Sequence, residues 1–165
     1  MKELIGKTIN SVHINEDGTV LKFSTDAGDM YYECYGDCCS ETWFADIIDS
    51  DFFLCNRVSH LEYARSVTDV EELEIPEWIN EMANRDSRGR QEHEQVYGYK
   101  IKARINNDSW RNRDFCDLVI IFRNSSNGYY GGSVELVKDN EWYKNILGRV
   151  TAYTYTKLTG DWRSE

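Results

Sequence analysis

Alternation of apolar and polar side chains over strand-length segments is the feature that most constrains the fold of this chain. The pattern predicts strands at residues 8–15, 19–25 and 30–35. Turn-forming residues separate these segments, at Glu16-Asp17-Gly18 and at Asp26-Ala27-Gly28-Asp29. Three successive strands joined by short turns predict an antiparallel β-meander in the first third of the chain.

Strand-like segments return in the last third of the chain. A polar stretch at residues 124–128 predicts a hairpin turn, because Asn-Gly adopts positive φ at little cost. The middle of the chain is less regular and suggests two further short strands, at residues 52–58 and 60–67. The strands expected in the last third are residues 96–105, 118–122, 129–137 and 150–155.

Two segments have helical rather than strand-like spacing. Trp43, Ile47 and Ile48 lie at i, i+4 and i+5, and Ser40 is a suitable N-cap. Residues 75–82 resemble a second short helix, with a proline tolerated in its first turn. The expected fold class is therefore α+β, an antiparallel sheet (meander plus C-terminal hairpin) packed by one or two short helices.

The chain, residues 1–165, is most simply a single domain. We expect an N-terminal meander and helix at residues 1–58, and C-terminal strands at residues 96–165. Between them, residues 59–95 form an acidic insertion. Its segment 84–94 is charged, lacks apolar side chains and is expected to be a mobile loop.

The net charge of −10 is unevenly distributed. Residues 1–95 hold 21 acidic and 8 basic side chains, whereas residues 96–165 hold 8 acidic and 11 basic ones. An acidic face of this kind either keeps the protein in solution or binds a basic surface, such as a nucleic-acid-binding groove on another protein. The candidate partner-binding residues are Glu71, Glu72, Glu74, Glu77 and Glu81.

The cysteines and histidines do not predict a metal or cofactor site. Cys34, Cys38 and Cys39 are spaced C-x3-C-C, and Cys55 or a histidine could supply a fourth ligand. Adjacent cysteines seldom ligate one ion well, so buried or reduced thiols are the alternative. His13, His60 and His93 are scattered, and no catalytic motif is present. We expect no metal, no cofactor and no catalytic residue.

Aromatic and basic residues in the last third suggest a ligand site instead. Tyr129 and Tyr130 follow the predicted turn, as the start of a strand with one ring on each face, and could stack on a base or a partner side chain. The alternative is that one ring packs in the core and the other is merely exposed. The basic-aromatic cluster Trp110, Arg111 and Arg113 could contact phosphate.

Two further absences guide the expected localisation. No run approaches the roughly 20 apolar residues that span a bilayer. Residues 1–6 lack the apolar region of a secretory signal. We therefore expect a cytosolic protein with no membrane partner.

The first third of the chain contains Asp37-Cys38-Cys39, and the last third contains Ser126-Asn127-Gly128-Tyr129-Tyr130. With further motifs at both ends, these resemble a small domain of unknown function that is encoded largely by tailed bacteriophages. The similarity covers about residues 1–55 and 96–137, with the remainder expected as additions. One departure is that Ser40-Glu41 follows the paired cysteines, where the family often has Glu-Ser. The matching motifs are Leu4-Ile5-Gly6-Lys7-Thr8-Ile9, Asp37-Cys38-Cys39-x-Glu41, Leu118-Val119-Ile120-Ile121-Phe122 and Ser126-Asn127-Gly128-Tyr129-Tyr130.

The resemblance implies a phage accessory protein in the host cytoplasm, and it carries over no catalytic residue. The leading hypothesis is an anti-CRISPR-like inhibitor that sets an acidic surface against the nucleic-acid-binding groove of a host defence protein. An alternative is a binder that sequesters a signalling nucleotide, with Tyr129 and Tyr130 stacking the base and Arg111, Arg113 or Arg123 meeting phosphate. A nuclease or nucleotide hydrolase is a third hypothesis.

Overall fold

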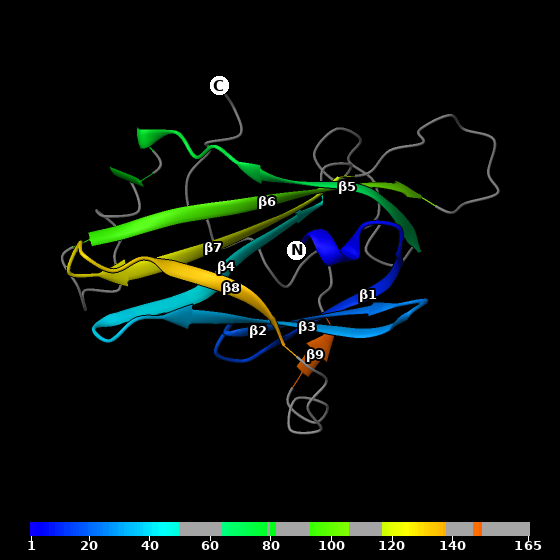
Figure 1. Ribbon diagram of the computed structural model, residues 1–165, viewed down its shortest axis with the longest axis horizontal. Coiled ribbons are helices and arrows are strands. Elements are labelled where there is room, and N and C mark those ends of the chain that lie inside the picture. Colours follow the sequence, from blue (N-terminus) through cyan, green and yellow to red (C-terminus); the bar gives the residue numbers. More distant parts are fainter. Residues whose placement is uncertain (50–63, 79, 82–92, 106–116, 138–146, 150–165) are drawn as a thin grey trace.

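The computed structural model describes residues 1–49, 64–78, 80–81, 93–105, 117–137 and 147–149. Within these residues the chain forms one short 3-10 helix and a nine-stranded antiparallel sheet (Figure 1). The first elements are η1 (Lys2–Leu4), β1 (Thr8–Asn15), β2 (Val20–Thr25), β3 (Gly28–Gly36) and β4 (Ser40–Asp49). The others are β5 (Arg65–Leu73), β6 (His93–Ile105), β7 (Leu118–Ser126), β8 (Gly132–Val137) and β9 (Leu147–Arg149).

The sheet bends into two layers around one core. Its strand order is β4-β7-β6-β5-β1-β2-β3-β8, and β9 pairs with the end of β1. Figure 1 shows β5, β6 and β7 in the upper layer and β1, β2, β3 and β8 in the lower layer, with η1 between them, whereas β4 runs from the lower layer beside β3 up to the upper layer. The main core draws on both layers and on η1, through residues such as Phe122, Phe23 and Leu4.

The predicted meander is confirmed, because β1 pairs with β2 and β2 pairs with β3. The bounds of the C-terminal hairpin were predicted less accurately. β7 extends to Ser126, so Asn124 belongs to the strand and not to the turn. β8 begins only at Gly132, so Tyr129 and Tyr130 lie in the β7–β8 connection and not on the two faces of a strand.

The predicted α+β class is wrong: the described part of the chain is almost entirely antiparallel sheet and contains no α-helix that packs on it. The segment read as a helix after the cysteines is β4. A bulge between Phe44 and Asp46 places Phe44 and Ile47 in the main core, whereas Trp43 and Ala45 join a second apolar cluster on the opposite face. Burial on both faces, combined with the bulge, removes the alternation and imitates helical spacing.

The second predicted helix, at residues 75–82, is described only in part, because residues 79 and 82 lie outside the described residues. Helical conformation is limited to Glu77–Trp78 and Asn80–Glu81 within the described residues. Leu73 and Ile75 pack against the second apolar cluster, so this segment covers the outer face of the sheet.

Other predictions fall partly or wholly outside the described residues. These are the strands at 52–58 and 150–155, the first part of the strand at 60–67, and most of the loop at 84–94. β5 begins within the predicted insertion and is an interior strand of the sheet. The predicted division of the chain at residues 1–58, 59–95 and 96–165 stays a prediction. In the part of the chain that the structure describes, no helix could cross a membrane.

Tyrosines form much of the polar margin of the core. Phe122 lies between the rings of Tyr97 and Tyr99, with centroid separations of 5.0 and 5.9 Å. Tyr32 is 1% exposed, meets Phe23 edge to face, and donates a 3.4 Å hydrogen bond to Glu3. Burial, followed by the nearby Glu3 carboxylate, raises the pKa of Tyr32 well above its usual value.

This raised pKa predicts alkaline destabilisation. In the unfolded chain a tyrosine ionises near pH 10, whereas folded Tyr32 stays protonated at higher pH, so stability present below about pH 10 is lost as pH rises. The loss for one fully buried phenol approaches about 1.4 kcal/mol per pH unit. We expect urea unfolding at about pH 8 and pH 11 to show a smaller pH-dependent loss for Tyr32→Phe than for wild type. Tyr129→Phe, at a side chain 90% exposed, is the control and should behave as wild type.

Candidate functional site

The two motifs noted in the sequence meet at one end of the sheet. β4 and β7 pair so that Ser40 lies opposite Ser126, and β3 and β8 pair so that Gly36 lies opposite Gly132. The β3–β4 turn and the β7–β8 connection therefore lie side by side. We call residues 36–40 and 126–132 together the turn end.

Local hydrogen bonds hold both turns. In the first, the backbone N–H and the hydroxyl of Ser40 both donate to the Asp37 carbonyl, at 2.9 and 3.1 Å. In the second, Gly128 N–H donates to Ser126 Oγ and Tyr129 N–H donates to Asn127 Oδ1, both at 3.1 Å. Gly128 has a φ of 89°, which an L side chain rarely adopts. These bonds define the conformation of both turns and hold Tyr129 at the surface.

Close packing joins the turns beneath the surface. The buried Asn124 amide donates a 2.8 Å hydrogen bond to Thr42 Oγ1. Gly132 lies against this pair, so a Cβ at that position would clash with the Thr42 side chain and lie 2.9 Å from Asn124 Cβ. The neighbouring Gly131 has more room, because the nearest atom to its Cβ position is Tyr97 Oη at 3.5 Å.

The adjacent glycines give a matched test of this packing. Gly132→Ala should destabilise the protein by about 1–3 kcal/mol, the usual cost of overpacking. Gly131→Ala should change stability by less than about 0.5 kcal/mol. Urea unfolding of both variants measures the difference, and equal stabilities would contradict the close approach of β8 to β4.

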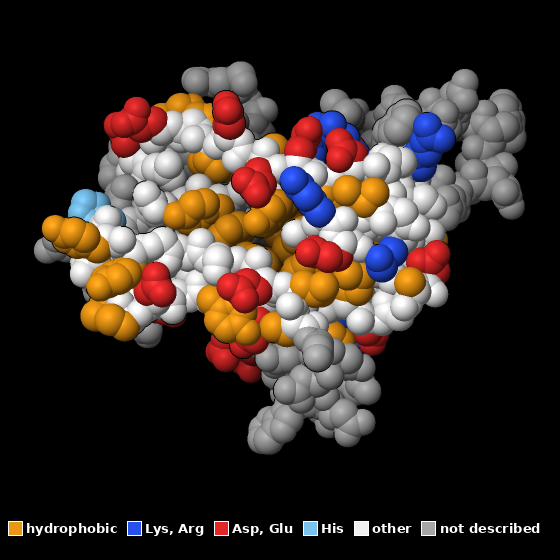
Figure 2. Space-filling model, in the orientation of Figure 1, with side chains coloured by type: hydrophobic (Ala, Val, Ile, Leu, Met, Phe, Trp, Pro, Cys, Tyr) orange, Lys and Arg blue, Asp and Glu red, His pale blue; other side chains and the backbone are white. Residues whose placement is uncertain are grey.

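A surface pocket of about 430 Å³ opens beside the β7–β8 connection. Tyr129, 90% exposed, forms part of its wall. Figure 2 shows hydrophobic side chains gathered at the left edge of the molecule, where Figure 1 places this connection. The lining residues are Glu77, Asn80, His93, Glu94, Gln95, Asn127, Gly128 and Tyr129.

A buried ion pair supports this pocket. Arg123 on β7 donates a 2.8 Å hydrogen bond to Glu94 on β6, and the side chain of Glu94 is fully buried. Sequence reasoning missed this pair because Glu94 was assigned to a mobile loop and Arg123 to phosphate binding. Glu94 neutralises the charge of Arg123, so Arg123 adds no free positive charge to the pocket. In addition, the exposed Glu77 carboxylate would repel a phosphate group. The pocket therefore suits a cationic group better than a nucleotide.

Removing one partner of this pair should be costly. Glu94→Gln leaves the Arg123 guanidinium, 13% exposed, without its buried counter-ion and should destabilise the protein by about 3 kcal/mol. The matched control is Glu71→Gln, because Glu71 lies 3.0 Å from Lys102 in an ion pair at the surface. Chemical denaturation should show no measurable change for the control. Equal, small effects would show that the Glu94–Arg123 pair is not structural.

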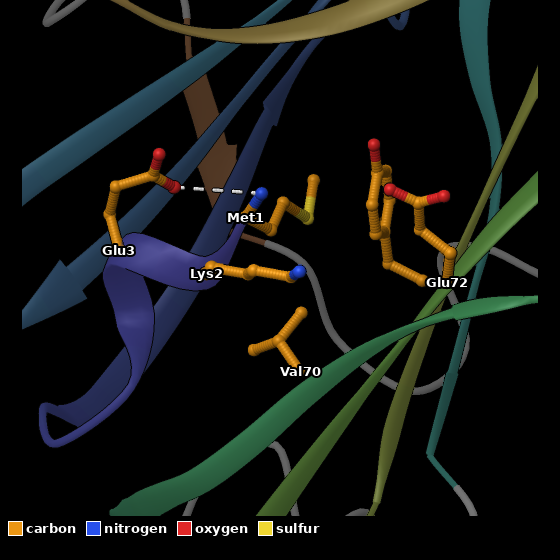
Figure 3. Close-up of a pocket in the computed structure, with 6 residues that line it drawn as sticks. Met1, Lys2, Glu3, Val70 and Glu72 are labelled. Carbon is orange, nitrogen blue, oxygen red and sulfur yellow. Dashed lines mark ion pairs between the residues drawn. The ribbon is translucent and has the colours of Figure 1, made fainter.

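The five glutamates predicted to bind a partner do not form one face. Glu71 pairs with Lys102 on the outer face of β5, and this hydrogen bond raises the pKa of Lys102. Glu72 points the other way, into a pocket of about 220 Å³ beside η1. Figure 3 shows Lys2 between Glu3 and Glu72 in that pocket.

The other three glutamates remain available. Glu74, Glu77 and Glu81 are exposed, and none of them forms an ion pair with another described residue. Glu77 lines the same pocket as Tyr129. One of the glutamates predicted to bind a partner therefore lies in one pocket with one of the residues predicted to stack on a ligand. Of the other stacking candidates, Tyr130 is 39% exposed in the same connection, whereas Trp110, Arg111 and Arg113 lie outside the described residues.

The cysteines separate into two environments. Cys34 packs against the main core, and burial raises the pKa of its thiol. Cys38 and Cys39 are exposed on the β3–β4 turn, with their sulfur atoms 3.8 Å apart. Among the described residues, no group of three or more His, Cys, Asp or Glu side chains is arranged to hold a metal ion.

Comparison with known families identifies residues 2–136 as a domain of unknown function, DUF7448. The chain belongs to this family. The matched range includes residues 56–95, which we had expected to be an addition, and it ends one residue before β8 does. No curated protein and no solved structure matches the chain. The family thus places both turns within one domain but assigns them no activity.

Proposed function

We propose that this protein is a phage accessory protein that acts in the host cytoplasm by binding and inhibiting a host protein. The target is a defence component of the CRISPR-effector kind, and the bound surface is its nucleic-acid-binding groove. The observation that carries the proposal is the position of Glu77 beside Tyr129 in one open pocket. The phage setting rests on the motif resemblance, since the family itself has no assigned activity.

Charge supports a basic partner. Glu74, Glu77 and Glu81 follow one another along the segment after β5, and all three are exposed. A groove that binds nucleic acid carries lysine and arginine side chains, which these carboxylates would neutralise in place of phosphates. The net charge of −10 would speed the encounter with such a groove.

The aromatic side chains supply the second half of the interface. Tyr129 is almost fully exposed on a turn whose backbone is held by hydrogen bonds. An exposed ring of this kind loses little conformational entropy on binding and can stack on an arginine guanidinium. A carboxylate beside such a ring would bind the guanidinium that stacks on it and fix the orientation of that guanidinium. Glu77 and Tyr129 together therefore match an arginine better than either does alone.

The proposal is tested by a triple variant, Glu74→Gln, Glu77→Gln and Glu81→Gln. Tagged protein is used to capture its target from host lysate at low and high salt, and the recovered protein is assayed for nucleic-acid binding. We expect wild type to compete with nucleic acid for the recovered protein. The triple variant should compete about tenfold more weakly, and added salt should weaken the wild-type complex by screening.

The matched control removes the same number of charges elsewhere, at Glu16→Gln, Asp17→Asn and Glu135→Gln, which are also exposed. It should compete as wild type does. A target whose binding resists high salt, or is lost equally in both triple variants, would contradict an acidic docking surface around Tyr129. A target with no nucleic-acid-binding activity would contradict the proposed inhibition.

A further inference from the structure

The paired cysteines of the β3–β4 turn are a sequence motif that the docking surface does not use. Cys38 and Cys39 are both exposed, and their Sγ atoms lie 3.8 Å apart. Adjacent side chains on an extended strand would point to opposite faces. Here the turn directs both thiols to the same side, because Cys39 has a φ of 69°.

The turn holds this arrangement without help from the thiols. Ser40 donates two hydrogen bonds to the Asp37 carbonyl, and β3 and β4 continue from either side of the turn. The backbone from Asp37 to Ser40 is therefore closed whether or not the sulfur atoms are occupied. A ligand that bound both thiols would find them already positioned, which reduces the entropic cost of binding.

The sulfur separation fits a shared central atom. Two sulfur atoms bonded at about 2.3 Å to one pyramidal trivalent centre, whose bond angles are smaller than tetrahedral, lie about 3.4 Å apart. The observed 3.8 Å separation reaches this value by a small rotation of the side chains. A direct disulfide needs a much shorter sulfur separation, about 2.04 Å, and between adjacent residues it closes a strained ring, because their Cα atoms lie closer together than in ordinary disulfides. The turn is thus better suited to chelating a thiophilic atom than to closing a disulfide.

The number of ligands narrows the choice of that atom. Zinc in structural sites takes four protein ligands, and no third His, Cys, Asp or Glu side chain joins the pair among the described residues. Cys34 is unsuited to joining it, because its thiol packs against the main core. A trivalent metalloid that already carries one organic group needs only two sulfur atoms to complete its coordination.

We propose that Cys38 and Cys39 form a two-sulfur binding site for a trivalent arsenic compound or a chemically equivalent thiophilic centre. With an aryl arsenoxide, two As–S bonds form and the arsenic–oxygen bond breaks. The two thiol protons leave with the oxygen as water, and no atom changes its oxidation state. The site requires no oxidant and is independent of the proposed inhibitory function.

The test uses phenylarsine oxide with the reduced full-length protein. Intact mass spectrometry should show one arsenic adduct per chain at near-stoichiometric concentration, and peptide mapping should place it on the peptide that contains Cys38 and Cys39. The adduct should resist a monothiol and be removed by a dithiol. Excess Zn²⁺ should not displace it, because two thiols alone bind zinc weakly.

Single-thiol variants give the decisive comparison. Cys38→Ser and Cys39→Ser should each bind the arsenical at least about a hundredfold more weakly, since the second bond of a chelate forms intramolecularly. Cys39→Gly is a further variant suited to the positive φ and should lose binding equally. Cys34→Ser is the matched control and should bind as wild type does. Circular dichroism confirms folding of each variant.

Three results would overturn the proposal. The first is the absence of an adduct in reduced wild-type protein, and the second is an adduct retained by the single-thiol variants. The third is an adduct mapped only to peptides that contain Cys55 or Cys116. Failure of the docking experiments above would leave this result unchanged, because the readout here is the mass of the purified chain.

Discussion

β4 pairs with β7 from Ser40 opposite Ser126 to Asp49 opposite Leu118, and the rest of the structure depends on this pairing. It joins the first and last thirds of the matched domain and sets Phe44 against Phe122 in the core. It also fixes where the two turns lie relative to each other. Because strand register determines which face each side chain occupies, a shift of one residue would exchange the core and outer clusters.

The turn end and the pocket beside it gather features that are dispersed along the chain. The exposed thiols come from the β3–β4 turn, Tyr129 comes from the β7–β8 connection, and Glu77 comes from the segment after β5. Beneath them the Glu94–Arg123 pair and the Asn124–Thr42 hydrogen bond provide a rigid, buried support. Exposed aromatic and charged groups on such a support are suited to binding a partner, since little conformational entropy is lost on association.

Sequence patterns predicted β7, whose apolar run is buried on both faces, but failed for β4, which also carries a bulge. The meander of β1 to β3 was recognisable from its short turns, although the adjacent Tyr31 and Tyr32 are both buried. By contrast, β4 lies between two apolar clusters and carries a bulge, which together imitate a helix. Glu77 and Tyr129 were each singled out, but their shared pocket was not predictable. Proximity in the sheet depends on long-range pairing, which no local pattern encodes. The Glu94–Arg123 pair was missed for the same reason.

The pairing of the two turns is tested most directly by nuclear Overhauser contacts in isotope-labelled protein. Cross-strand contacts between Gly36 and Gly132 and between Ser40 and Ser126 are expected. Contacts between Phe23 and Met30, in the adjacent strands β2 and β3, serve as the internal reference. Detection of all three sets would establish that the turns share one end of the sheet. Reference contacts without the other two would contradict the shared turn end and the docking surface built on it.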